Sequence, residues 1–112
     1  MTYELILTAL ADPTRRRIFE DLRRGARPVS KLAEGRSVSR PAVSQHLKVL
    51  EQAGLVTARQ QGTARIYRIR PEGLAELRAY LDSMWDDALV AFAAEVDRQK
   101  EDENDRASDQ DH

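Results

Sequence analysis

The segment from Ser39 to Val56 carries the side chains of this 112-residue chain that are best suited to hydrogen-bonding a partner. Its apolar residues Val43, Leu47 and Leu50 recur at helical spacing, so they share one face of a helix. Side chains that point largely away from this face are those of Arg40, Pro41, Ser44, Gln45 and Lys48. A helix whose apolar face packs on the protein while hydrogen-bond donors and acceptors point outward is typical of helices that read DNA.

Both ends of this helix have local signals. Ser39 can accept a hydrogen bond from a first-turn amide, and Pro41 suits that turn because it needs no amide donor there. Gly54 can adopt the left-handed conformation that ends a helix. We therefore expect the helix to begin after Ser39 and to stop at Gly54.

The composition predicts one soluble, cytoplasmic domain. Of the 112 residues, 41% are hydrophobic and 33% are charged, without a long apolar run or a signal peptide. The absence of cysteine excludes disulfides, thiolate metal sites and cysteine catalysis.

The net charge of −1 hides an uneven distribution along the chain. Residues 13–70 carry 14 Lys or Arg against 4 Asp or Glu, whereas residues 71–112 carry 4 against 13. A basic body predicts a surface that binds a polyanion, and the acidic end predicts a solvated tail. The alternative is an ordinary charged surface.

The first half of the chain predicts short helices. Leu5, Ile6, Ala9 and Leu10 favour a helix that ends at Asp12, where Asp12 and Pro13 begin the next. The second helix has its core residues between 18 and 22 and is expected to end at Gly25, and a third spans about 29–34. After the turn at residues 35–38, the third helix and the helix described above form a helix-turn-helix.

The second half predicts a hairpin and one long helix. Strands are expected over 55–60 and 65–70, around the turn at residues 61–64. Pro71 opens the helix, whose apolar residues recur every three or four positions. From Asp97 the sequence has almost no apolar content, which predicts a disordered acidic tail over 97–112 after a folded domain over 1–96.

The apolar stripe of the long helix is too long for a small monomer to cover. Together with the first helix it predicts a homodimer interface. The expected interface residues are Leu5, Ile6, Leu77, Leu81, Met84, Trp85, Leu89 and Phe92. Two alternatives remain: the helix folds back on its own core, or a pocket near Met84 and Trp85 holds an apolar ligand.

Three segments, taken in order, carry a family resemblance: residues 9–16 (ALADPTRR), residues 39–56 and residues 61–67 (QGTARIY). Over about Leu7 to Tyr80 the chain resembles the ArsR/SmtB family of bacterial winged-helix repressors. The resemblance implies a mainly α fold with a β-hairpin wing, in the order of four helices, two strands and a last helix. It also implies a homodimer that binds an imperfect palindromic operator in double-stranded DNA.

The resemblance also implies roles for individual residues. The expected DNA contacts are Ser39, Arg40, Pro41, Ser44, Gln45 and Lys48 on the recognition helix, and Thr63 and Arg65 on the wing. Arg40 and Gln45 are expected to read base edges, because Arg can fork onto guanine and Gln onto adenine. Ser39, Ser44 and Lys48 are expected on phosphates, and the wing residues on backbone or minor groove.

The chain departs from the metal-sensing members of this family. Residues 31–34 (KLAE) replace their Cys-x-Cys pattern, and the only histidines are His46, expected to pack beside the apolar face, and His112. Asp82, Asp86 and Asp87 alone are poor zinc ligands. We expect no metal at the family's usual sites and no cofactor.

Enzymatic function has no support, because the sequence has neither a phosphate-binding glycine loop, a nucleophile elbow nor a metal-ligand cluster. Two other functions stay open: a winged helix that binds protein, and a sequence-neutral DNA-coating protein. The arginine-rich body argues against the first of these, because phosphate tracking requires like charge and protein interfaces deplete it.

Overall fold

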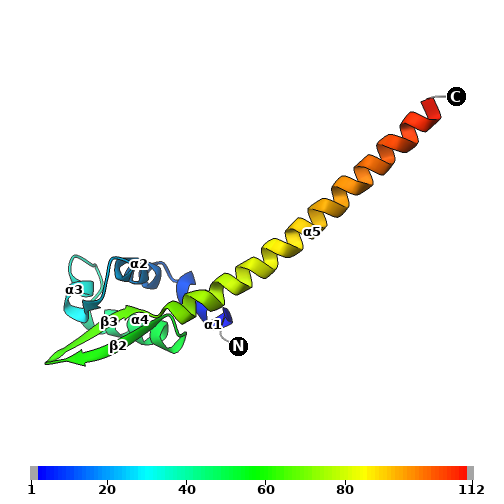
Figure 1. Ribbon diagram of the computed structural model, residues 1–112. Helices are drawn as coiled ribbons and strands as arrows, with labels where there is room; N and C mark the ends of the chain where they lie inside the picture. The colour runs from blue at the N-terminus through cyan, green and yellow to red at the C-terminus, as the bar shows by residue number, and fades with distance from the viewer. Residues whose placement is uncertain (1–2, 111–112) are drawn as a thin grey trace. The chain divides into compact units, whose positions relative to one another are not determined.

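The computed structural model describes residues 3–110 (Figure 1). Its elements, in order, are α1 (Tyr3–Ala11), α2 (Pro13–Leu22), β1 (Arg27–Pro28), α3 (Val29–Ala33), α4 (Arg40–Gln52), β2 (Val56–Gln61), β3 (Ala64–Ile69) and α5 (Pro71–Gln110). Two compact units share these elements: the first ends at Arg78, within α5, and the second begins at Ala79. Among the described residues, no helix has an apolar stretch long enough to cross a bilayer.

The core of the first unit is built from one face of each helix and from the inner face of the sheet. Its largest completely enclosed side chains are Ile6, Ile18, Leu32, Leu47, Leu50, Leu55, Val43 and Val56. The predicted apolar face of α4 is therefore confirmed, since all three of its residues have no exposed surface. Burying each such side chain contributes about 1.5–3 kcal/mol, which fixes the rotation of α4 about its axis.

The corner between α1 and α2 is held by hydrogen bonds to helix ends. Asp12 caps α2 by accepting from the Arg15 amide at 2.9 Å, which lowers the pKa of the Asp12 carboxyl group. The Arg15 side chain donates to the Ala9 carbonyl at 2.9 Å, and that of Arg16 to the Leu10 carbonyl at 2.9 Å. Two arginines of the basic body thus satisfy the open carbonyls at the end of α1, where positive charge is favoured.

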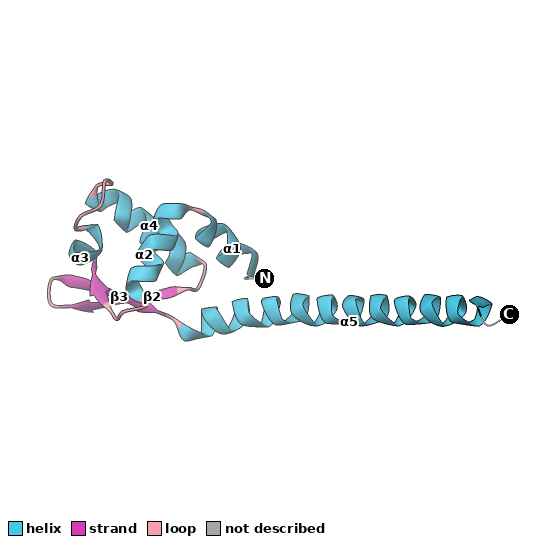
Figure 2. Cartoon of the chain, turned by 90° about the horizontal axis from the view of Figure 1, so that it is seen from above, coloured by secondary structure: helices cyan, strands magenta, loops and turns pink. Residues whose placement is uncertain are grey.

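The sheet has the strand order β1-β3-β2 and is antiparallel throughout. The hairpin predicted from the sequence is confirmed within one residue at each edge, with Val56 opposite Ile69 and Gln61 opposite Ala64. Figures 1 and 2 show β2 and β3 reaching out to a tight turn, where Gly62 takes φ +63°. The two-residue strand β1 was not predicted, because it is too short for an alternating pattern and contains a proline.

A close backbone contact joins the end of α4 to the start of α5 within the first unit. Gly54 ends α4 with φ +79°, as predicted, and the Arg70 amide donates to the Leu55 carbonyl at 2.8 Å. A Cβ atom on Gly73 would lie 2.1 Å from the Gly54 carbonyl oxygen. Only glycine at position 73 allows the first turn of α5 to lie this near.

The helix α5 is 40 residues long and continues to Gln110. It therefore runs past Asp97, the point from which the sequence predicted disorder, and Asp111 and His112 lie outside the described residues. The Arg, Gln, Lys and Glu residues of this charged segment are good helix formers, and the pair of Arg98 with Glu95, one turn earlier, favours helix at its start. The proposed division of the chain after residue 96 stays a prediction.

Replacing Gly73 with alanine should destabilise the protein. Helix propensity alone would favour alanine by about 1 kcal/mol. The collision with the Gly54 backbone instead predicts a loss of about 1–3 kcal/mol in the free energy of unfolding. Urea unfolding measures the sign of the change in the free energy of unfolding. Glu76→Ala, at an exposed position of the same helix, is the control. A more stable Gly73→Ala protein would contradict the close contact.

Replacing Asp12 with alanine should lower Tm at neutral pH, because α2 loses its cap. The Asp12→Asn protein keeps a hydrogen-bond acceptor, so its Tm should lie between those of the wild type and of Asp12→Ala. The carboxylate contributes stability above its usual pKa of 3.8, and this contribution is lost as pH falls through its lowered folded-state pKa. Thermal melts across the acid range should therefore show the wild type and Asp12→Asn converging. A gap that stays constant into acid would exclude this charge contribution.

Candidate nucleic-acid interface

The polar face of α4 lies on the surface, directly after the loop that joins it to α3. Ser39 caps the helix, with its hydroxyl oxygen 3.3 Å from the Ala42 amide, and Pro41 occupies the first turn. The side chains of Arg40, Gln45 and Lys48 are exposed, and Ser44 is half-buried. The structure thus brings the predicted recognition residues together on one face, opposite the seat made by Val43, Leu47 and Leu50.

His46 is half-buried on the flank of α4. Its charge is one of the smaller influences that lower the pKa of Asp12 at the start of α2. This position beside α2 is in keeping with the packing role expected for His46, which remains a prediction.

The wing presents Thr63 at its exposed turn, whereas Arg65 is engaged by the protein itself. The Arg65 side chain donates to the Tyr67 hydroxyl at 3.1 Å, and its guanidinium lies 3.6 Å from the Glu51 carboxylate and 5.6 Å from the centre of the Tyr67 ring. The hydrogen bond to Tyr67 raises the pKa of Arg65, and Glu51 adds to this effect. Arg65 therefore ties the wing to the last turns of α4.

Two other arginines of the wing, Arg59 and Arg68, are exposed on β2 and β3. They line a shallow depression of about 150 Å³ together with Ala26, Gln61 and Ile66. Among the described residues, neither arginine forms an ion pair with an acidic side chain. These two side chains add positive charge to the wing. The sequence left open whether Arg59 assists DNA binding or is only a solvated charge of the strand, and it gave Arg68 no role.

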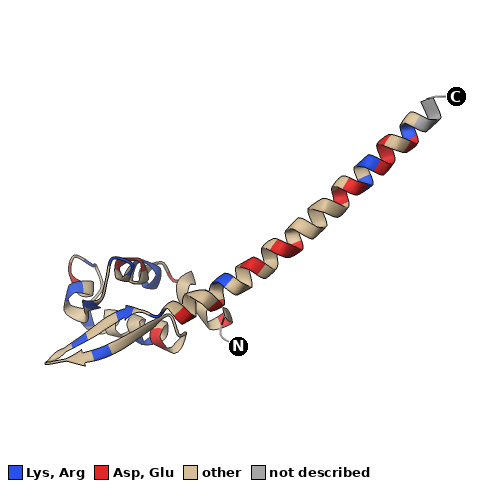
Figure 3. Cartoon of the chain, in the orientation of Figure 1, with Lys and Arg blue, Asp and Glu red and all other residues tan. Residues whose placement is uncertain are grey.

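The charges separate along the chain as the sequence indicated. Lys and Arg are spread over α2, α3, α4 and the wing, whereas Asp and Glu predominate along α5 (Figure 3). Within residues 3–110, no three His, Asp or Glu side chains are grouped so that they could hold a metal ion.

The residues predicted for a dimer interface divide into three groups. Leu5 is 54% exposed on α1, and Leu81, Met84, Trp85, Leu89 and Phe92 are 49–67% exposed on α5. Leu77 is half-buried against the core. Ile6 is a correction: it has no exposed surface and belongs to the core of the protomer, because α1 turns this side chain inward and leaves Leu5 outside.

Comparison with known proteins places this architecture. A helix-turn-helix domain family model matches residues 10–59. The chain is 52% identical over 94 residues to the HTH-type transcriptional regulator Rv2034 of Mycobacterium tuberculosis, covering 84% of this chain and 88% of that protein. It is 42% identical over 72 residues to the HTH-type transcriptional repressor SmtB of the same species, covering 64% of this chain and 53% of that one.

Solved structures agree with this placement. An ArsR family transcriptional regulator, RHA00566, matches with a TM-score of 0.72 and 32% identity, over 77% of this chain and 94% of that chain. The homodimeric winged helix-turn-helix DNA-binding domain of Mb0332 from Mycobacterium bovis matches with a TM-score of 0.62 and 33% identity, over 79% and 82%. The extent and identity of these matches, together with the fold, show that the chain is a transcriptional regulator with a helix-turn-helix DNA-binding domain and belongs to the ArsR/SmtB family.

Proposed function

We propose that this regulator is a dimeric repressor that binds an imperfect palindromic operator, with one α4 in the major groove of each half-site. The observation that carries the proposal is the exposed polar face of α4 above a completely buried apolar seat. A helix anchored in this way presents the same few side chains to every partner. Sequence-specific reading of DNA requires that the same side chains always face the base edges, whereas sequence-neutral coating needs only positive charge.

Within this proposal, Arg40 and Gln45 read base edges. Both are exposed on α4, and among the described residues the side chain of neither is held by a hydrogen bond or an ion pair to another part of the protein. Arg40 can donate two hydrogen bonds to guanine, and Gln45 can pair with adenine. Ser39, Ser44 and Lys48 contact phosphates, Pro41 packs beside them, and Thr63 meets the backbone from the wing. Arg65 acts mainly by holding the wing against α4, through its interactions with Glu51 and Tyr67.

The dimer part of the proposal rests on α5. Leu81, Met84, Trp85, Leu89 and Phe92 lie within an arc of about 140° at about 100° per residue, and all are exposed in the protomer. An exposed apolar face of this extent is typical of an interface between subunits. The homodimeric Mb0332 domain supports the same assembly, and the SmtB relative supports a repressor role. In the first unit, the exposed side chain of Leu5 stays a proposed dimer contact, and the completely buried side chain of Ile6 does not.

Alanine at Arg40 and at Gln45 should reduce discrimination between the operator and scrambled DNA by about 1–3 kcal/mol for each base-reading side chain removed. Fluorescence anisotropy with the protein's own upstream DNA and a scrambled duplex measures this difference. Arg24→Ala and Gln52→Ala are matched controls, because both are exposed residues of the same types, one in the turn after α2 and one at the end of α4. A chelator should leave every titration unchanged, since we propose no metal at the family's usual sites.

The outcomes separate the alternatives. If both duplexes bind equally and the variants keep the discrimination of the wild type, the protein coats DNA without reading it. If neither the upstream duplex nor a wider set of genomic fragments binds, the winged helix serves a protein partner instead. Binding that a chelator abolishes would contradict the proposed independence from metal.

Alanine at Trp85 or Phe92 should weaken the dimer, because aromatic anchors carry much of the energy of an apolar interface. We expect the dissociation constant of the dimer to rise by about 30-fold, which corresponds to about 2 kcal/mol. Sedimentation equilibrium measures this constant, and Asp87→Ala, on the polar side of the same helix, is the control. A wild-type protein that sediments as a monomer at all concentrations would exclude the dimer.

A further inference from the structure

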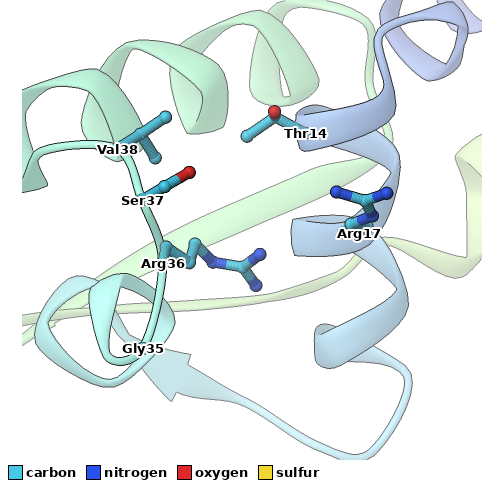
Figure 4. Close-up of a pocket in the computed structure, with 6 residues that line it drawn as sticks. All are labelled: Thr14, Arg17, Gly35, Arg36, Ser37 and Val38. Atoms are coloured by element: carbon cyan, nitrogen blue, oxygen red, sulfur yellow. The ribbon is translucent and has the colours of Figure 1, made fainter.

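A polar hollow of about 320 Å³ lies between α2 and the loop that joins α3 to α4 (Figure 4). Its lining residues are Thr14 and Arg17 of α2, and Gly35, Arg36, Ser37 and Val38 of the loop. Arg36 reaches from the loop toward α2, and the Ser37 hydroxyl lies on the side of the loop that faces Thr14. Two guanidinium groups and two hydroxyl groups therefore border one space, and no acidic residue of the described part of the chain lines it.

The two arginines of the hollow are not equivalent. Arg36 pairs with the Asp21 carboxylate and donates to the Leu32 carbonyl, and its side chain is only 14% exposed. Arg36 is thus held in place on one side of the hollow, and the Asp21 carboxylate partly offsets its charge. Arg17, one turn after Thr14 on α2, is exposed, and among the described residues it pairs with no carboxylate. The uncompensated positive charge of the hollow comes from Arg17.

This set of groups matches the chemistry of a phosphate. A phosphate offers several acceptor oxygens and negative charge, and the hollow offers donors only of the kinds that phosphates take: guanidinium and hydroxyl. The space is much larger than one water molecule needs, so a tetrahedral oxyanion fits inside it. A guanidinium on one side and hydroxyls on the other would hold such a group from two directions.

The position of the hollow indicates where the phosphate comes from. Ser37 stands two residues before Ser39, the cap of α4, and three before Arg40. A group held in the hollow therefore lies beside the end of α4 that begins the recognition face. Contacts to DNA phosphates from arginine and hydroxyl groups are those that fix the register of a protein on the duplex.

We propose that this hollow binds a backbone phosphate of the DNA that flanks the groove occupied by α4. Arg17 supplies the charge, Thr14 and Ser37 supply hydroxyl donors, and Arg36 shapes the wall. The proposal rests on the DNA binding proposed above and adds a contact from α2, outside the helix-turn-helix and the wing. The same chemistry would suit a free phosphate, and the experiment below separates the two sources.

Arg17→Gln should weaken binding to the upstream duplex and to scrambled DNA by the same factor. Removing one phosphate interaction should also reduce the slope of log K against log salt by about 0.9. Ser37→Ala should weaken both duplexes equally with a smaller change in slope, and Arg17→Lys should restore the slope because it keeps the charge. Anisotropy titrations over a range of salt concentrations measure all of these, with circular dichroism to verify folding.

Arg24→Gln is the matched control, because it removes the same charge from the turn that follows α2 and does not line the hollow. Its slope should remain that of the wild type. If Arg24→Gln and Arg17→Gln reduce the slope equally, the effect is one of net charge and the hollow is not a phosphate site.

A second measurement titrates inorganic phosphate into the 15N-labelled protein without DNA and follows the amides of Gly35 and Ser37. If Arg17→Gln leaves the DNA slope unchanged while phosphate shifts these amides in the wild type only, the hollow serves a free phosphate and the DNA assignment is wrong. No response in either measurement would overturn the site altogether. If Arg17→Gln reduces the discrimination between the upstream and scrambled duplexes but leaves the slope of log K against log salt unchanged, Arg17 reads a base. That result would also overturn the phosphate site.

The proposed sequence-specific function could fail while the phosphate site holds, and the titrations would then give a different result. In that case the wild type would bind the upstream and scrambled duplexes alike. The slope difference between Arg17→Gln and Arg24→Gln on scrambled DNA would still decide whether the hollow holds a backbone phosphate.

Discussion

The burial of one face of α4 is the constraint on which the rest of the interface depends. Val43, Leu47 and Leu50 have no exposed surface, and together their burial outweighs any single surface hydrogen bond of about 0.5–1.5 kcal/mol. A rotation of α4 by one residue would turn this face about 100° away from the core. The polar residues of α4 therefore need no contacts of their own to be held outward, and their donors remain available to a partner.

Some arginines of the first unit hold its elements together, whereas others are exposed and leave their charge available to a polyanion. Only the structure shows which arginines belong to which group. Arg15 and Arg16 close the end of α1, Arg36 joins the loop before α4 to α2, and Arg65 joins the wing to α4. The sequence showed an excess of positive charge and predicted a polyanion surface from it. The ion pairs of Arg36 with Asp21 and of Arg65 with Glu51 connect residues 15 and 14 positions apart, which no local pattern reveals.

Local signals account for what the sequence predicted well. Asp12, Ser39 and Gly54 mark helix ends through their own hydrogen bonds or backbone freedom, so the helices and the hairpin were predictable. Periodicity could not tell which of two apolar faces of α1 packs on its own core, and for that reason Ile6 was assigned to the interface. The exposed polar face of α4 was predictable from one helix, whereas the hollow at Arg17 exists only because the fold brings α2 beside the loop.

The contact of Gly73 with Gly54 has a mechanical consequence. Here the backbone of one helix meets the backbone at the end of another, with no side chain between them to yield. A roll of the first turn of α5 toward the end of α4 would bring these backbone atoms into collision. The contact therefore limits how far the start of α5 can move toward the end of α4.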